Sequence, residues 1–291
     1  MKKIIVLFLF AFVVSPAWSQ DKAILVDVDW LKANLSDPKV VVLQVSFLKF
    51  DYDREHIQGA RYLWPGWLGP DSPEGALNVP DTDKANEVLR DLGINNDSHI
   101  ILCHIRNEVS PTARVFLTFE HLGFRGRVSF LNGGLEQWKK DGNAVTAEIP
   151  TVKKGNAKVK TGDLIVNKDY VLKTLKSDNA LVVDARATRF YDGEPTGNPR
   201  DGHITGAKNI PYMDLVDANN LYKPLSELQN YFTPVASKDK ELVVYCFIGQ
   251  TASVVYMAGR MLGYNVKLYD GSMQEWSRID SLPMEKTQKS P

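Results

Sequence analysis

A pattern that occurs twice in the chain limits its possible folds more than any other feature. The segment HIQGA at 56–60 returns as HITGA at 203–207. After each copy come an apolar strand, a helical stretch that ends in Leu-Gly-aromatic, and a turn that leads to a tryptophan. Because these correspondences keep the same order, we expect two similar domains in tandem. The matching segments are 100–103 with 242–245, 122–124 with 262–264, and 130–138 with 268–276.

Short apolar strands alternate with longer helical patterns in both halves. Strands are expected at 40–45, 181–184 and 242–245. This alternation predicts an α/β fold of two tandem domains, each with a mainly parallel sheet flanked by helices. A chain of 291 residues, 44% of them hydrophobic, can bury a core in each domain.

A stretch without periodicity separates the two halves. From about 146 to 161 the chain carries Pro150 and the charged segment VKKGNAKVK, which is typical of a linker. We therefore expect a first domain at 20–147, a linker at 148–161 and a second domain at 162–291.

Residues 1–19 have the composition of a secretory signal peptide. Two lysines precede an apolar run from 4 to 14, and small residues lead to a cleavage site before Gln20. The eleven residues of this run are too few to span a bilayer. We therefore expect export to the periplasm or the outside of the cell, with no integral membrane span after cleavage.

Composition and spacing argue against two kinds of ligand. Lys plus Arg number 35 and Asp plus Glu also number 35, so no overall charge draws the chain to nucleic acid. No pair among His56, His104 and His203 has the spacing of metal ligands, and we expect these histidines to make structural hydrogen bonds.

A cysteine lies where an apolar strand of the second half ends. In the stretch YCFIGQTAS, Cys246 follows the strand and Ala252 begins a helical run. Ligands of open parallel sheets bind beyond the carboxyl ends of the strands. Gly249 lets the loop curl until its amide N–H groups point at the sulfur, and the helix N-terminus adds a partial positive charge. Both effects favour a thiolate.

Two other interpretations of this cysteine compete. Cysteine phosphatases also place a cysteine loop before a helix, but they clamp phosphate with an arginine at the position that Ala252 occupies here. Free cysteine is also among the most often buried residues, which favours a purely structural role. The glycine-containing turn at the end of a strand makes a functional role the stronger interpretation.

Three arginines lie near strand ends and loops of the second half. Guanidinium groups bind carboxylate or sulfonate through two N–H donors. Arg186 is next but one to Asp184, and we expect a structural ion pair there. For Arg189 and Arg200 we expect anion binding.

Together these motifs resemble those of the tandem-domain rhodaneses, sulfurtransferases of the thiosulfate and 3-mercaptopyruvate group. The resemblance covers essentially the whole chain after the signal peptide. Its marks are Asp184-Ala185-Arg186 with Arg189-Phe190, the run from Gly202 to Pro211, the loop from Cys246 to Thr251, and Tyr269 to Ser272 with Glu275-Trp276.

The resemblance implies a ping-pong sulfur transfer without a metal or organic cofactor. The Cys246 thiolate takes a sulfane sulfur from a donor and passes it to cyanide or a thiol. The amides of Phe247, Ile248, Gly249, Gln250 and Thr251 would stabilise the persulfide. The family's two carboxylate-binding arginines fall on Arg189 and Arg200, and the hydroxyl of Thr251 is a hydrogen-bond donor to sulfur or substrate.

The same resemblance implies that only the C-terminal domain is catalytic. Aligning the two halves places His104 opposite Cys246, while Cys103 falls one residue short. Gln44 and Ser46 replace the aspartate and arginine of the second half. We expect the first domain to be a non-catalytic partner, with Cys103 as a small strand residue of its core.

The loop departs from the family at its first two positions. Thiosulfate-preferring relatives place basic residues there, mercaptopyruvate-preferring ones place small polar residues, and this chain has Phe247 and Ile248. The apolar rim predicts an organic persulfide, a mercapto acid or a protein thiol as a reaction partner.

A second class of function stays open. The chain could be a sulfur-carrier or redox-sensing module of the cell envelope that does not catalyse repeated sulfur transfer. The sequence leaves the donor, the acceptor and the oligomeric state undetermined.

Overall fold

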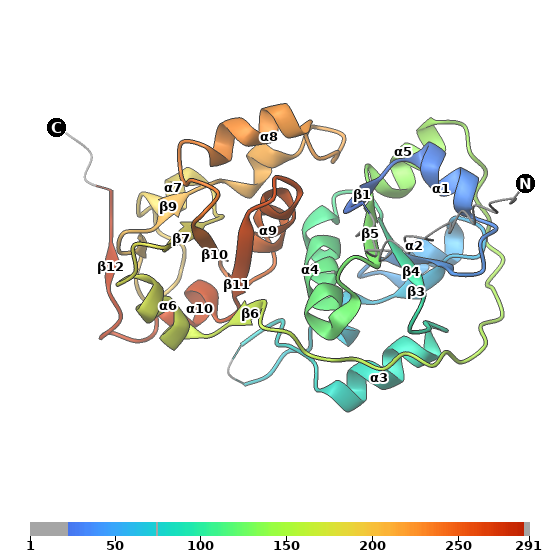
Figure 1. Ribbon diagram of the computed structural model, residues 1–291, viewed down its shortest axis with the longest axis horizontal. Coiled ribbons are helices and arrows are strands. Elements are labelled where there is room, and N and C mark those ends of the chain that lie inside the picture. The colour runs from blue at the N-terminus through green and yellow to red at the C-terminus, as the bar shows by residue number, and fades with distance from the viewer. Residues whose placement is uncertain (1–22, 74, 288–291) are drawn as a thin grey trace, which may run out of the picture.

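The computed structural model describes residues 23–73 and 75–287, and within them it contains two similar α/β domains. Each domain has a five-stranded sheet, in the orders β1-β5-β4-β2-β3 and β6-β11-β10-β7-β9. All the strand pairs in both sheets are parallel. Figure 1 shows the two domains side by side, each with helices on both faces of its sheet. The predicted fold class is therefore confirmed.

The first domain contains the elements of the blue-to-green half of the chain (Figure 1). Its strands are β1 (Leu25–Val26), β2 (Val40–Val45), β3 (Arg61–Leu63), β4 (His99–His104) and β5 (Val128–Leu131). Its helices are α1 (Val28–Asn34), α2 (Lys49–Arg54), η1 (Pro65–Trp67), α3 (Thr82–Asp91), α4 (Val109–Phe119), η2 (Glu120–Phe124) and α5 (Gly134–Lys140).

The second domain repeats this plan and adds a small antiparallel pair. Its main strands are β6 (Ile165–Val166), β7 (Ala180–Asp184), β9 (Lys208–Asn209), β10 (Glu241–Tyr245) and β11 (Asn265–Tyr269), and β8 (His203–Ile204) pairs with β12 (Met284–Glu285). Its helices are α6 (Lys168–Thr174), α7 (Thr188–Tyr191), η3 (Tyr212–Leu215), α8 (Leu225–Phe232), α9 (Ala252–Met261) and α10 (Ser272–Trp276).

Equivalent residues begin the first long helix of each domain. The carboxylate of Asp27 accepts a hydrogen bond from the Trp30 N–H at 2.7 Å, and the side-chain oxygen of Asn167 accepts one from the Tyr170 N–H at 3.1 Å. Both are N-cap bonds, which satisfy a helix donor that would otherwise lack a partner. The repeat in the sequence is thus also a repeat of local structure.

The histidines of the HIxGA repeat have structural contacts in both domains. The Nδ1 atom of His56 donates to the carbonyl of Tyr52 at 2.8 Å, and that of His203 donates to the carbonyl of Tyr191 at 2.7 Å. Each imidazole also stacks on the ring of the same tyrosine. The structural role predicted for these two histidines is confirmed.

The register of the sheets aligns the two halves residue by residue. In the first domain Cys103 of β4 pairs with Gln44 of β2, and in the second Tyr245 of β10 pairs with Asp184 of β7. Cys103 is therefore the counterpart of Tyr245. The next residue, His104, is the counterpart of Cys246, as the sequence alignment predicts.

Residues 147–162 contain no helix or strand and run along the first domain. The Arg90 Nε atom donates to the carbonyl of Ala157 at 2.8 Å, and the N–H of Val159 donates to Asn86 Oδ1 at 2.9 Å. These bonds attach the connection to α3.

The signal peptide predicted at 1–19 lies outside the described residues and stays a prediction. No helix of the described segments has the length and apolarity that crossing a bilayer needs.

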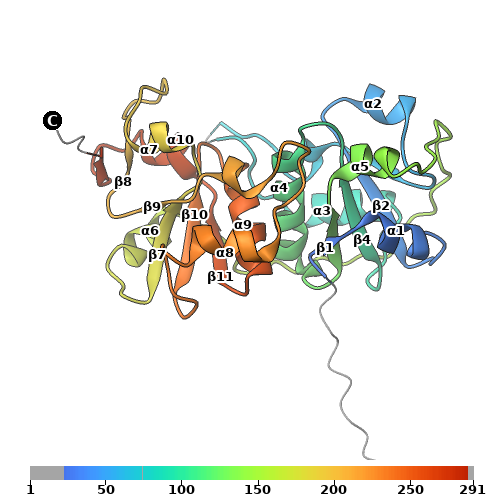
Figure 2. The ribbon, with the colours of Figure 1, turned by 90° about the horizontal axis from the view of Figure 1, so that it is seen from above.

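Helices α4 and α9 bring the two domains together. They lie against each other in the middle of the molecule in both Figure 1 and Figure 2, which views it from above. Across this contact the buried carboxylate of Glu120 accepts hydrogen bonds from Tyr256 Oη at 2.5 Å and Arg260 Nη2 at 3.0 Å. A single apolar core cluster contains residues of both helices. The domains are therefore joined by packing and by buried charge.

We predict that Arg260→Met destabilises the protein by about 3 kcal/mol, because the hydroxyl of Tyr256 would be the one remaining hydrogen-bond partner of the buried Glu120 carboxylate among the described residues. Urea unfolding at pH 7 measures this change. The control is Lys39→Met, which removes the exposed ion pair with Asp97 and should leave the unfolding midpoint unchanged. Equal shifts of the midpoint in the two variants would contradict the structural role of the Glu120 cluster.

Candidate active site

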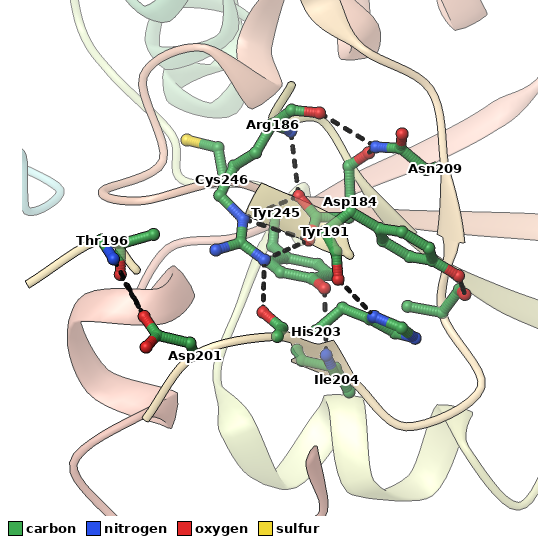
Figure 3. A network of polar contacts seen from close by, with 12 residues as sticks. Asp184, Arg186, Tyr191, Thr196, Asp201, His203, Ile204, Asn209, Tyr245 and Cys246 are labelled. Carbon is green, nitrogen blue, oxygen red and sulfur yellow. Dashed lines mark hydrogen bonds and ion pairs between the residues drawn. The ribbon is translucent and has the colours of Figure 1, made fainter. Parts of the chain in front are cut away.

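Cys246 is the first residue after β10, at the carboxyl edge of the second sheet. Only 1% of the residue is exposed. Figure 3 shows its side chain beside Arg186 and next to the ends of β7 and β10. This is the edge at which parallel α/β sheets bind their ligands.

The first turn of α10 holds the backbone at Cys246 and Phe247. The Cys246 N–H donates to Ser272 Oγ at 3.2 Å, and the Cys246 carbonyl accepts a bond from the Met273 N–H at 3.0 Å. The carbonyl of Phe247 accepts from the Gln274 N–H at 2.9 Å. These three bonds fix the start of the loop on a neighbouring element.

The rest of the loop has free backbone donors. Among the described residues, none accepts a hydrogen bond from the N–H of any residue from 247 to 251. Gly249 has a φ of 79°, and a left-handed residue inside such a turn points successive N–H groups to one side. The ten-residue helix α9 follows directly, and Thr251 makes no side-chain capping bond to it. The free N–H groups of residues 247–251 and the positive end of the α9 dipole together favour a negative charge on the cysteine sulfur.

Asp184 and Arg186 form a buried ion pair beside the cysteine. Arg186 Nη2 lies 2.6 Å from Asp184 Oδ2, and both side chains are completely buried. Arg186 Nη2 also donates to the carbonyl of Gly202 at 2.7 Å. The expected structural pair is present. Arg186 Nη1, however, is buried without a hydrogen-bond partner among the described residues, which the sequence does not indicate.

Two aromatic residues and one arginine lie at the rim of the loop. The rings of Phe190 and Phe247 meet edge to face with centroids 5.3 Å apart. The Cζ atom of Arg189 lies 4.5 Å from the centre of the Phe190 ring. The Arg189 side chain is 63% exposed, and its Nε is 3.9 Å from Glu194 Oε2. Its guanidinium therefore keeps donors for an incoming anion.

The contacts of Arg200 differ from the predicted anion site. Four of its N–H groups donate to backbone carbonyls at 2.6 to 3.0 Å, those of Trp276, Ser277, Ile279 and Leu282. The physical reason is that the carbonyls at the end of α10 lack partners within the helix. Arg200 therefore caps α10, and Arg189 is the arginine with free donors at the rim.

The three other predicted loop residues differ in their contacts. Ile248 is partly buried at the rim. Gln250 Nε2 reaches across the domain boundary to Ser110 Oγ at 3.3 Å. The hydroxyl of Thr251 makes no hydrogen bond within the described part of the chain, so it remains available to a ligand.

The first domain has no equivalent anion site at His104. The imidazole is buried, its pKa is lowered to about 4 by that burial, and it is therefore neutral at pH 7. Cys103 is fully buried in β4, and burial raises the pKa of its thiol. The prediction that Cys103 belongs to the core is confirmed. Neither residue offers a reactive anion at the equivalent edge.

Three residues of the site were not singled out from the sequence. Ser272 and Asp270 belong to a recognised motif, and their contacts with the cysteine loop could have been suspected from it. Arg114 comes from α4 of the other domain, and its Nη1 lies 2.6 Å from Asp270 Oδ1. No local pattern indicates this contact.

The described residues contain no group of three or more His, Cys, Asp or Glu side chains arranged for a metal.

Comparisons with known proteins agree with the fold. The rhodanese-like domain family matches residues 27–141 and again 167–279. The sulfur carrier protein TtuD of Thermus thermophilus is 33% identical over 279 residues, which is 90% of this chain and 96% of that protein. The 3-mercaptopyruvate sulfurtransferase of Escherichia coli K12 is 30% identical over 275 residues, with coverages of 89% and 97%.

A solved structure also has the same fold. SseA from Escherichia coli, a 3-mercaptopyruvate sulfotransferase with the rhodanese fold, superposes with a TM-score of 0.77 at 28% identity. The superposition covers 86% of this chain and 99% of SseA.

We predict that Gly249→Ala disturbs the loop more than its backbone strain alone accounts for. A left-handed φ costs alanine about 1 kcal/mol, and a Cβ at Gly249 would also lie 3.0 Å from Arg114 Nη1. The matched control is Gly206→Ala, which has the same φ of 79° and no atom within 4 Å of the new Cβ.

Urea unfolding of both variants should show a larger loss for Gly249→Ala. If the two variants lose the same free energy of unfolding, the loop is not packed as tightly as these distances indicate.

Proposed function

The chain belongs to the rhodanese-like domain family, and from this premise we propose that it is a sulfurtransferase that works through a Cys246 persulfide. The observation that carries the proposal is the set of free backbone N–H groups at residues 247–251 around a cysteine that ends a strand. Relatives named as sulfurtransferases support sulfur transfer in general. The C-terminal domain is the one that carries out the reaction.

The reaction has two steps, each with a balanced exchange of one sulfur. The Cys246 thiolate attacks the sulfane sulfur of the donor, an S–S bond to the enzyme forms, and the donor leaves with the electron pair of its broken bond. The terminal sulfur then carries the negative charge, which the loop amides stabilise. In the second step cyanide or a thiolate attacks that sulfur, and the Cys246 thiolate is released.

The rim residues favour an organic donor. Phe190, Phe247 and Ile248 offer apolar surface, and the loop itself has no cation. Arg189 supplies donors for one carboxylate, while the guanidinium of Arg200 is engaged at the end of α10. A mercapto acid or an organic persulfide fits this rim better than the thiosulfate dianion, which gains less stabilisation when the loop itself has no cation.

A carrier function is the second candidate, and one observation favours it. A relative at 33% identity is named a sulfur carrier protein. A carrier would accept sulfur on Cys246 and hold it until a specific partner removes it. Single loading with a donor, but no turnover with cyanide or small thiols, is the result that would distinguish it from the enzyme.

Replacing the thiol tests the assignment of Cys246. We predict that Cys246→Ser abolishes cyanide-dependent thiocyanate formation, because serine cannot form a persulfide. Intact mass of the wild type after donor treatment should show an adduct of about 32 Da that cyanide removes. Cys103→Ser is the control and should keep both properties, since Cys103 is fully buried in the first domain. Persistence of the adduct in Cys246→Ser would disprove the assignment.

The apolar rim predicts a donor preference that kinetics can measure. The kcat/KM should be higher for 3-mercaptopyruvate or glutathione persulfide than for thiosulfate. Phe247→Lys places a cation at the rim and should raise kcat/KM for thiosulfate about tenfold, from a gain of about 1.4 kcal/mol. This gain should shrink as salt is added, because salt screens exposed charges. A wild-type protein that clearly prefers thiosulfate would contradict the proposed donor class.

A further inference from the structure

Arg114 of the first domain lies directly against the cysteine loop of the second. A Cβ built on Gly249 would lie 3.0 Å from Arg114 Nη1 and 3.3 Å from both the carbonyl oxygen and Oδ1 of Asp270. The backbone at Gly249 therefore rests on the ion pair between these two residues. Gly249 is also the left-handed residue of the loop, so its position sets the direction of the amides on either side.

The ion pair is fixed on both sides of the domain boundary. Arg114 Nη1 lies 2.6 Å from Asp270 Oδ1, and the Arg114 side chain is 3% exposed. Arg114 Nη2 donates to the carbonyl of Leu77 in the first domain. Burial, followed by the charge of Arg114, lowers the pKa of the nearby His121, so this imidazole is neutral at pH 7. Arg114 is therefore the charged partner of Asp270. The guanidinium is thus held in one place.

A second contact between the domains supports the same turn. Gln274 Oε1 accepts from the Ala76 N–H at 3.0 Å, and Gln274 Nε2 donates to the Ala76 carbonyl at 3.2 Å. Gln274 belongs to α10, and its own N–H holds the carbonyl of Phe247. Residues of the first domain therefore support the loop at two points, through Asp270 and through α10.

We propose that Arg114 is a positioning residue for sulfur transfer. Together with Asp270 it holds Gly249 where the free amides of residues 247–251 converge on the sulfur of Cys246. The opposite charges of the pair largely cancel at a distance, so the effect acts through the loop geometry. This inference rests on the proposed sulfurtransferase function and adds that the first domain completes the site of the second.

The test measures sulfur loading in a single turnover. Reduced protein is mixed with glutathione persulfide, quenched by alkylation, and the rate of appearance of the adduct of about 32 Da is followed by intact mass. We expect Arg114→Met to slow loading about 100-fold, since a displacement of about 1 Å can cost that much. Arg114→Lys should lie between Arg114→Met and the wild type. In steady state the loss should appear in kcat, with a nearly unchanged KM for the donor.

Arg260→Lys is the matched control. It makes the same change as Arg114→Lys in the other buried ion pair between the domains, Arg260 of α9 with Glu120 of η2. It should lower the melting temperature and leave the loading rate within about twofold of the wild type, because Arg260 does not touch the loop. This separates positioning from stabilisation of the interface.

The outcomes distinguish failure of the role of Arg114 from failure of the sulfurtransferase proposal. Loading of Arg114→Met at the wild-type rate would overturn the role of Arg114 and leave the sulfurtransferase proposal intact. If Arg260→Lys slowed loading as much as Arg114→Lys, the role of Arg114 would be overturned as well, since any weakening of the domain interface would then be enough to slow loading. If Arg114→Met does not fold, Arg114→Lys decides between these results. A wild-type protein that accepts no sulfur from any donor would refute the proposed function and the inference with it.

Discussion

The site depends on backbone N–H groups that have no partner among the described residues. Leaving five consecutive donors free at residues 247–251 costs stability wherever water cannot reach them. These donors lie at the junction of β10 and α9. An anionic sulfur on Cys246 would satisfy those donors. A charged sulfur on Cys246 and the loop would thus be complementary.

The same fold in the first domain shows what is lost when this complementarity is absent. His104 occupies the place of Cys246, and as a buried neutral imidazole it brings no anion. The first domain nevertheless contacts the second through α4, which supplies Arg114 and Ser110, and through η2, which supplies Glu120. The two domains thus share one fold, and in the proposed function the second provides the reacting cysteine while the first supports its loop.

Sequence patterns were sufficient for the features that rest on local chemistry. The repeat predicted two α/β domains, the alignment of strands placed His104 opposite Cys246, and the spacing of Asp184 and Arg186 predicted their ion pair. Each of these depends on residues that are close in sequence or follow the periodicity of a strand.

Contacts between residues far apart in sequence were beyond such patterns. Arg200 looked available for an anion because the carbonyls it binds belong to residues 276–282, which only the fold brings near. Arg114 looked like an ordinary helix residue because its partner, Asp270, lies in the other domain. In both cases an arginine was assigned by its neighbours in sequence, while its donors were determined by tertiary structure.

The amide protons of residues 247–251 give the most direct test of the central claim, that these backbone donors hold the sulfur. Their chemical shifts can be followed by ¹⁵N-resolved NMR before and after loading with glutathione persulfide. Hydrogen bonds to a charged acceptor are short and strong, so these protons should move downfield on loading and return when cyanide removes the sulfur. A persulfide that forms on Cys246 while these five shifts stay unchanged would contradict the account.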